Sequence, residues 1–239
     1  MDIIEFSNLM KEYGKEIQIK FTEEQLQKFY KYMNMLIEWN KKINLTAIIE
    51  PKEIILKHFI DSLTILKYVN DNEKMLDVGT GAGFPGIPIK IMNSNIEITL
   101  LDSLNKRINF LNEAINKLEL KNISAIHSRI EDYGKNNKYR EKYDIVTSRA
   151  VANLATLSEY MLPMLKIKGK SICMKGSDIK EEVKNSKRAI DILGGEIVNI
   201  EELVLPKSDN RRNLIIIKKK KNTPLKYPRK AGIPSKEPL

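Results

Sequence analysis

A glycine-rich run at residues 75–86, Met-Leu-Asp-Val-Gly-Thr-Gly-Ala-Gly-Phe-Pro-Gly, constrains the fold of this chain more than any other segment. It opens as a short apolar strand that carries one acid, Asp77. Glycine permits a tight turn at the carboxyl end of a strand and lets the backbone lie against a flat ligand. Pro85 indicates the start of a helix, because its fixed φ and missing N–H suit a first turn. The run therefore predicts the first strand, loop and helix of an open α/β sheet. The three glycines at alternate positions are Gly79, Gly81 and Gly83.

Two nucleotide-like cofactors fit this loop. Residues 81–86 match the G-x-G-x-x-G pattern of NAD enzymes, but the match begins two residues after the strand ends. Pro85 also removes a backbone donor near the place where a pyrophosphate would need one. An acid two residues before the first glycine instead suits S-adenosylmethionine, which has no phosphate and whose ammonium group favours a nearby carboxylate such as Asp77. A glycine turn that only connects strand to helix is the third interpretation.

A second acidic strand end supports a ribose-containing ligand. Residues 96–102, Ile-Glu-Ile-Thr-Leu-Leu-Asp, read as a strand that ends in Asp102, which lies 23 residues after Gly79. A carboxylate at that point can accept hydrogen bonds from both ribose hydroxyls. NAD sites also bind ribose through a carboxylate at this position. Asp102 therefore predicts a ribose but does not distinguish NAD from S-adenosylmethionine.

Composition excludes several classes of protein. The 239 residues suit one α/β domain with an extension. No apolar run approaches the roughly 20 residues of a membrane span, and the N-terminus lacks the pattern of a signal peptide. Cys173 is the one cysteine, and with two histidines it predicts neither a disulfide nor a metal cluster. We expect a soluble cytoplasmic protein with no metal, no membrane contact and no inferred protein partner.

The positive charge is concentrated at the C-terminus. Residues 218–239 hold eight basic side chains and one acidic one, which is +7 of the net charge of +10. A basic, proline-rich tail suits a phosphate-binding arm, a membrane-surface contact or a solubilising end. Tyr227, Arg229 and Ile233 interleave aromatic, guanidinium and apolar groups, which favours stacking on RNA over binding lipid.

Periodicity divides the chain into three parts. Residues 1–70 have the three-and-four spacing of apolar side chains that is typical of helices. Within them, Thr22-Glu-Glu-Gln25 is a capping box that begins one helix, and a second helix is expected at 53–69. Strands and helices alternate over residues 71–218, and residues 219–239 form the basic tail.

The alternating part predicts an α/β fold with a seven-stranded, mostly parallel sheet covered by helices on both faces. Its last two strands form an antiparallel hairpin. Such a closing hairpin is typical of class I S-adenosylmethionine methyltransferases, which are Rossmann-like, and is absent from the ordinary NAD fold. The expected strands are 75–79, 96–101, 123–127, 143–148, 170–174, 197–205 and 213–217.

Ligands of such sheets lie outside the carboxyl ends of the parallel strands. After the third strand, Ile130 could cover an adenine face and Glu131 could bond its amino group. The fourth strand ends at Arg149 and the fifth at Lys175. His58 shares one helix face with Asp61 and Ser62, either as a polar cluster that faces the cofactor cleft or as a helix face with a satisfied histidine.

The segment after the fourth strand narrows the chemistry. The Asn/Asp-Pro-Pro-Tyr loop used to methylate exocyclic amines is missing there, and Cys173 lies in an apolar strand, where it is expected to be a core residue. A ring nitrogen with a free lone pair, such as guanine N7, needs only in-line positioning against the methyl donor. Arg149, Lys175 and His58 are then expected to position the substrate.

A set of segments spread along the chain carries a resemblance to a known family: Trp39-Asn40, Asn44-Leu45-Thr46, His58 with Asp61-Ser62-Leu63, the glycine run, Ser148-Arg149-Ala150, Lys175-Gly176 and residues 227–236. Together they resemble the RsmG family, once named glucose-inhibited division protein B (GidB), which methylates guanine N7 in bacterial 16S ribosomal RNA. The resemblance covers essentially the whole chain, and its C-terminal signature is similar to that of the Firmicute branch.

The resemblance implies an S-adenosylmethionine cofactor and a 16S rRNA or small-subunit substrate, held partly by the basic tail and the N-terminal helices. Position 130 is Ile where the family commonly has Ala, which keeps an apolar contact. Two other functions stay open: a non-catalytic ribosome assembly factor with a cofactor pocket, and an NAD-dependent oxidoreductase. The residues implied to contact the cofactor are Gly79, Phe84, Ile130, Glu131 and Arg149, beside Asp77, Gly81 and Asp102 from the strand ends.

Overall fold

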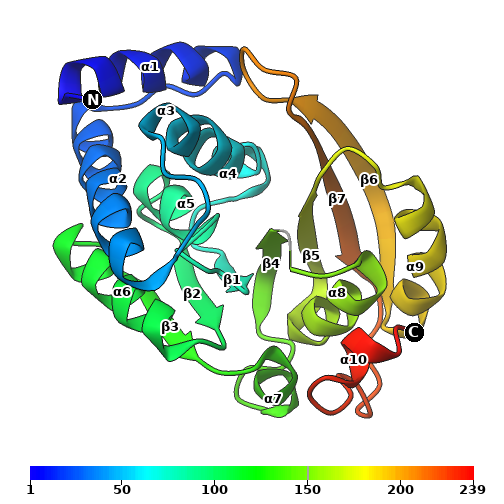
Figure 1. Ribbon diagram of the computed structural model, residues 1–239. Coiled ribbons are helices and arrows are strands. Elements are labelled where there is room, and N and C mark those ends of the chain that lie inside the picture. The colour runs from blue at the N-terminus through cyan, green and yellow to red at the C-terminus, as the bar shows by residue number, and fades with distance from the viewer. Residues whose placement is uncertain (150) are drawn as a thin grey trace.

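The computed structural model describes residues 1–149 and 151–239 (Figure 1). Ala150, the last residue of the Ser148-Arg149-Ala150 segment, lies outside the described residues. None of the helices in the described part of the chain is both long enough and apolar enough to cross a membrane.

A seven-stranded sheet forms the centre of the molecule, in the order β3-β2-β1-β4-β5-β7-β6 (Figure 1). The five strands from β1 to β5 are parallel, and β7 runs antiparallel to both β5 and β6. The predicted α/β sheet with its closing hairpin is therefore confirmed. The strands are β1 (Lys74–Val78), β2 (Glu97–Asp102), β3 (Ile123–His127), β4 (Tyr143–Arg149), β5 (Leu165–Lys175), β6 (Gly195–Val204) and β7 (Arg211–Lys219).

The central strands are apolar on both faces because helices cover both sides of the sheet. Two consecutive residues of β1, whose side chains point to opposite faces of the sheet, show this: Met75 belongs to one buried cluster, and Leu76 belongs to the other. The first cluster packs under the N-terminal helices together with α5 (Gly86–Met92) and α6 (Asn105–Lys117). The second packs under α8 (Leu154–Met161) and α9 (Lys180–Ile192), and it contains the predicted core residue Cys173.

The N-terminal helices begin with α1 (Ile3–Glu16) and α2 (Glu23–Ile43). The predicted capping box at the start of α2 is confirmed, since Thr22 and Gln25 bond each other's backbone N–H groups. The helix expected at 53–69 is confirmed only in part: helical backbone is continuous over residues 51–63, but its pitch changes along the way and it ends before a separate 3₁₀ turn. The pieces are α3 (Pro51–Ile54), the π-helical segment η1 (Ile55–Ile60), α4 (Asp61–Leu63) and the 3₁₀ turn η2 (Leu66–Tyr68).

The basic tail packs against the body of the protein beside α7 (Ile130–Lys135) and α8 (Figure 1). Lys219 is fully buried and donates to the carbonyl oxygen of Leu162, in the 3₁₀ turn η3 (Leu162–Met164). The chain ends in one helical turn, α10 (Ile233–Lys236), next to α8. This tail is therefore folded onto the α/β body through buried contacts.

Candidate functional site

A pocket of about 340 Å³ opens at the carboxyl ends of β1 to β3, beside the switch point where the strand order turns from β1 to β4. Nucleotide-like ligands bind at such switch points. Four residues singled out from the sequence line this pocket together: Gly79, Asp102, Ile130 and Glu131. Segments that lie more than 50 residues apart in the chain thus meet at one site.

Gly79 has a conformation and surroundings that only glycine fits. Its φ is +65°, in the left-handed region that side chains disfavour. A Cβ atom added there would lie 2.7 Å from Cγ2 of Val151, which lines the same pocket. The loop therefore presents bare backbone to the pocket at this point.

Asp77 is a buried carboxylate with an unused oxygen. Its Oδ2 accepts hydrogen bonds from Thr80 Oγ1 at 2.7 Å and from the Gly86 N–H at 2.9 Å. Its Oδ1 has no hydrogen-bond partner among the described residues. Burial raises the pKa of Asp77 to about 6, although these two hydrogen bonds and Arg149 favour the carboxylate. A cationic ligand beside the loop would give Oδ1 a hydrogen-bond donor and would stabilise the charged carboxylate.

Asp102 fixes the glycine loop from the neighbouring strand. Its Oδ2 accepts the Gly81 N–H at 2.9 Å, and its Oδ1 accepts the Leu104 N–H at 3.0 Å. Arg107 also reaches Oδ2 at 3.1 Å, with a side chain that is one-third exposed. A ribose at Asp102 would therefore share the carboxylate with this partly exposed side chain or displace it.

Arg149 joins the end of β4 to the N-terminal helices. Its Nη1 donates to the Lys57 carbonyl oxygen at 2.9 Å and to Asp61 Oδ2 at 3.2 Å, and its Nη2 donates to His58 Nδ1 at 2.9 Å. A guanidinium carries five N–H donors, so two have no partner among the described residues and could serve a ligand. The partners lie on η1 and at the start of α4, and π-helical turns are frequent at functional sites.

His58 is neutral and has a defined tautomer. Because a guanidinium can only donate, the His58 Nδ1 that Arg149 contacts must be unprotonated, so Nε2 carries the proton and donates to Thr46 Oγ1 at 2.8 Å. Burial, helped by the Arg149 charge, lowers the pKa of His58 to about 3. His58 is thus suited to hold Arg149 and unsuited to act as an acid near pH 7.

Phe84 is buried against the same cluster. The His58 ring stacks on it, with ring centroids 4.5 Å apart, and the Arg149 guanidinium carbon lies 5.0 Å from its ring centroid. Its ring is therefore covered by protein groups, and contact with a ligand is left to its backbone or ring edge.

Lys175 is not brought together with Arg149 and His58 in this hydrogen-bonded cluster. Its ammonium pairs with Glu182 at 2.6 Å and donates to the Ala152 carbonyl oxygen, so it fastens the chain beyond β4 to α9. The tail side chains expected to stack on RNA also have other partners. Tyr227 is buried, and Arg229 pairs with Glu159 at 2.7 Å.

Sequence reasoning missed Arg212, which precedes the apolar part of β7. Its Nε donates to Asp61 Oδ1 at 3.0 Å, so Asp61 is held by two arginines at once. The only available signal was a polar loop ending in two arginines, which any exposed hairpin could carry. It also missed Gly232 and Ser235 of the tail, which line the pocket.

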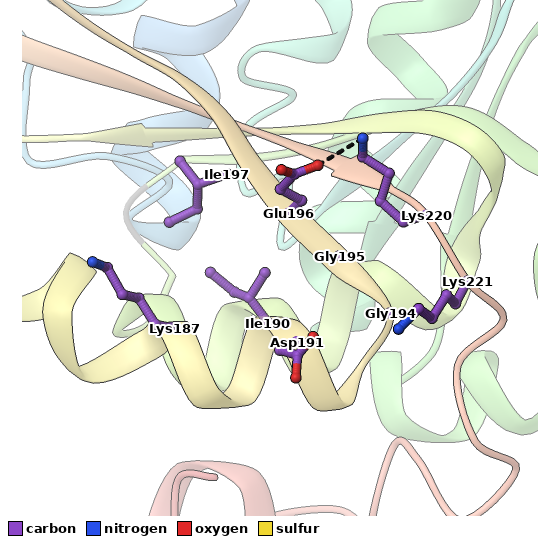
Figure 2. Close-up of a pocket in the computed structure, with 9 residues that line it drawn as sticks. All are labelled: Lys187, Ile190, Asp191, Gly194, Gly195, Glu196, Ile197, Lys220 and Lys221. Atoms are coloured by element: carbon purple, nitrogen blue, oxygen red, sulfur yellow. Dashed lines mark ion pairs between the residues drawn. The ribbon is translucent and has the colours of Figure 1, made fainter.

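A second concavity, of about 430 Å³, lies between α9 and the start of β6 (Figure 2). Gly195 there pairs with Lys219, at the end of β7 remote from Asn213, which pairs with Lys175 at the carboxyl end of β5. The concavity therefore lies at the amino ends of the parallel strands, and the pocket beside Gly79 lies at their carboxyl ends. Its lysines are on the surface, and no group of three or more His, Cys, Asp or Glu in the described chain could hold a metal ion there or elsewhere.

The sheet order and the glycine loop at its switch point define the class I fold of S-adenosylmethionine-dependent methyltransferases. The same fold is seen in a SAM-dependent methyltransferase from Aquifex aeolicus, with a TM-score of 0.54 and 17% identity over 73% of this chain and 96% of that one.

The family described as rRNA small subunit methyltransferase G (GidB) matches residues 25–215. The chain belongs to this family. A relative from Desulforamulus reducens, named ribosomal RNA small subunit methyltransferase G, is 59% identical over 96% of this chain and 97% of its own length. One of the same name from Acetivibrio thermocellus is 55% identical over 92% and 91%. The predicted family, enzyme class and S-adenosylmethionine cofactor are thereby confirmed, and the NAD alternative is dropped.

Proposed function

We propose that this protein transfers a methyl group from S-adenosylmethionine to N7 of a guanine in 16S ribosomal RNA. The observation that carries the proposal is the buried Asp77 oxygen without a partner among the described residues, at a bare-backbone loop beside a nucleoside-sized pocket. A ligand that carries both an ammonium group and a nucleoside fits these two features together. Membership of an rRNA methyltransferase family supports the RNA substrate.

In this proposal the pocket holds the nucleoside half of the cofactor. Asp102 accepts the ribose hydroxyls, Ile130 covers one face of the adenine, and Glu131 accepts its amino group. Gly79 lets the ring system lie against the backbone of the loop. All four line the same pocket.

The methionine half is held by the groups at the other side of the loop. Asp77 attracts the ammonium group, and the two remaining N–H donors of Arg149 bind its carboxylate or a substrate oxygen. Gly81 and Phe84 contribute backbone groups to this side of the site. A Cβ added at Gly81 would meet nothing within 4 Å, so the backbone there is open to a ligand. The bound cofactor supplies a methyl group on a positively charged sulfur.

Guanine N7 has a free lone pair, so the protein needs to position the base more than to remove a proton. Holding the two reactants in line can supply most of the rate, up to about 7–11 kcal/mol. Arg149 stays at the strand end because neutral His58 and Asp61 fix it. His58 is therefore a positioning residue in this scheme, and Lys175 acts only through the chain at Ala152.

Binding of RNA is proposed for the exposed lysines of the tail and for the N-terminal helices. Lys221, Lys226, Lys230 and Lys236 are all exposed although the tail is folded. Such side chains attract phosphates without regard to sequence. A cytoplasmic location is part of the same proposal, because the substrate is ribosomal RNA.

The affinity for S-adenosylhomocysteine is expected to depend on pH through Asp77. Its pKa of about 6 in the free protein means that the carboxyl group is protonated in mild acid. The ligand's ammonium group favours the carboxylate, so binding must release this proton below pH 6. The Kd should be constant above pH 7 and rise by up to about tenfold per unit below 6. Calorimetry across pH 5–8 measures it, and Asp77→Asn should bind weakly with a flat profile. An equally steep profile for Asp77→Asn would assign the proton to another group.

The salt dependence of RNA binding tests the tail. Changing Lys221, Lys226, Lys230 and Lys236 to Gln should lower the slope of log K against log salt by about 0.7–0.9 for each phosphate that the variant no longer neutralises. Changing all four to Arg keeps the charge and should keep the slope. Deleting residues 219–239 is a poorer experiment, because Lys219 and Thr223 are buried. An unchanged slope in the Gln variant would remove the tail from the RNA interface.

The proposed function is tested by incubating the protein with tritiated S-adenosylmethionine and small ribosomal subunits that lack the modification. Radioactivity in the RNA supports it. RNA that stays unlabelled, with a protein shown to bind S-adenosylhomocysteine, would overturn it.

A further inference from the structure

The end of the chain forms part of the pocket that Glu131 lines. Gly232 and Ser235 face this pocket together with Tyr160 of α8. Gly232 and Ser235 belong to a segment about 100 residues after Glu131 in the chain, which lies next to α7 and α8 in Figure 1. The pocket is therefore incomplete without residues 231–239, here called the C-terminal segment.

Two buried charges hold the chain just before the C-terminal segment. Arg140 donates to the carbonyl oxygens of Thr223 and Tyr227, each at 2.7 Å. The Glu159 carboxylate is fully buried and accepts both the backbone N–H and the side chain of Arg229 at 2.7 Å. Because an unpaired buried charge is costly, these anchors fix the path of the chain independently of the C-terminal segment.

The C-terminal segment itself makes one hydrogen bond to α7, at a wall of the pocket, and one to α8, outside the pocket lining. The Gly232 N–H donates to Glu131 Oε1 at 2.9 Å, and Thr156 Oγ1 donates to the Pro234 carbonyl oxygen at 2.8 Å. Burial, with the Glu131 charge adding to it, raises the pKa of Tyr160 to about 12. Tyr160 thus keeps its proton and remains a donor beside Glu131.

We infer that the C-terminal segment is one wall of the nucleoside half of the cofactor site, and that Gly232 positions Glu131 for the adenine amino group. The inference rests on the proposed function, since it takes the pocket to be the adenine site. One Glu131 oxygen is held by a backbone N–H, and a carboxylate can accept further bonds. This hydrogen bond restricts the rotamers of the Glu131 side chain before the cofactor binds. Binding then loses less side-chain entropy, and the affinity is higher.

The test is a chain that ends at Lys230. It keeps the Arg140 and Glu159 anchors, and the deleted segment contains one lysine and one glutamate, so the net charge of the side chains is unchanged. The Kd for S-adenosylhomocysteine, without RNA, should rise about 10- to 100-fold, as expected for a hydrogen bond to a charged group. KM for S-adenosylmethionine should rise with it, while kcat at saturation stays near that of the full chain.

A full-length variant guards against loss of folding in the shortened chain. Gly232→Val has space for its side chain, since a Cβ there meets nothing within 4 Å, but its φ of +83° is disfavoured for valine. The N–H should turn away from Glu131 and Kd should rise. The control is Lys184→Gln with Lys187→Gln, which removes two exposed charges from α9 and should leave the Kd for S-adenosylhomocysteine unchanged.

The outcomes separate the two proposals. If the full chain does not bind S-adenosylhomocysteine, the proposed function itself fails. If the full chain binds and both the shortened chain and Gly232→Val bind equally well, the C-terminal segment is not a wall of the site and only this inference is overturned.

Discussion

Replacing Gly79 with valine is expected to weaken binding of S-adenosylhomocysteine by about 100-fold or more. The added side chain has no space, because even its Cβ would lie 2.7 Å from Val151 in the pocket. The backbone is also left-handed there, which costs a residue with a side chain about 1–2 kcal/mol. Isothermal calorimetry measures the loss of binding, and thermal unfolding shows whether the fold survives.

Gly81→Ala is the matched control for backbone strain. The φ of Gly81 is +61°, close to the +65° of Gly79, but a Cβ there meets nothing within 4 Å. This variant should be destabilised to a similar degree and should lose much less affinity. Equal losses in both would show that strain in the loop, rather than occupation of the pocket, governs binding. Full binding by Gly79→Val would contradict the assignment of this pocket.

Replacing Arg149 with methionine is expected to lower kcat/KM for methyl transfer by about 100-fold or more, which is typical for loss of one positioned electrostatic group. Asp61 keeps Arg212 as an ion-pair partner, so the free energy of unfolding should fall by about 1.5–3 kcal/mol, as for loss of a hydrogen bond to a charged group. Methyl transfer under saturating cofactor and chemical denaturation measure the two effects.

Arg212→Met separates the structural loss from the functional one. It removes the other guanidinium from Asp61 and should destabilise the protein to a comparable degree. It leaves the contacts of Arg149 with Lys57 and His58 in place, so its loss of kcat/KM should be much smaller. If both variants lose activity equally, Arg149 acts only by holding the N-terminal helices to the sheet.

The sheet could be predicted because its signals are local. Apolar runs of strand length, bounded by polar turns, located the seven strands to within a few residues, with β5 the exception. Its amino end continues back to Leu165 through charged residues, paired across an irregularity in β4. Polar side chains at strand ends also predicted the pocket, since parallel strands place their carboxyl ends at one edge.

The arrangement around Arg149 could be predicted only in part. His58 and Asp61 were expected on one helix face, and they do meet one arginine. The π-helical pitch of η1 has no sequence signature, and it was read as ordinary helix. Arg212 lies 151 residues from Asp61, so that no local spacing links the two.

The tail shows the limit of composition as evidence. Its lysines and prolines are typical of a free arm. Arg140 and Glu159, two charged residues elsewhere in the chain, hold the tail against the body of the protein. Their partners are mostly backbone atoms of the tail. Backbone acceptors are the same at every residue, so a sequence contains no mark of where such an arginine will bind.

The most direct test of the central claim is the position of the transferred methyl group. Small subunits that lack the modification are incubated with the protein and S-adenosylmethionine, and the RNA is then treated with chemistry that cleaves at N7-methylguanosine. Cleavage at one guanine of the small-subunit RNA is expected, and the methyl group should appear there about 100-fold more slowly with Arg149→Met. Tight binding of the cofactor without any methylation of subunits, free RNA or assembly intermediates would contradict it and would favour a non-catalytic assembly factor.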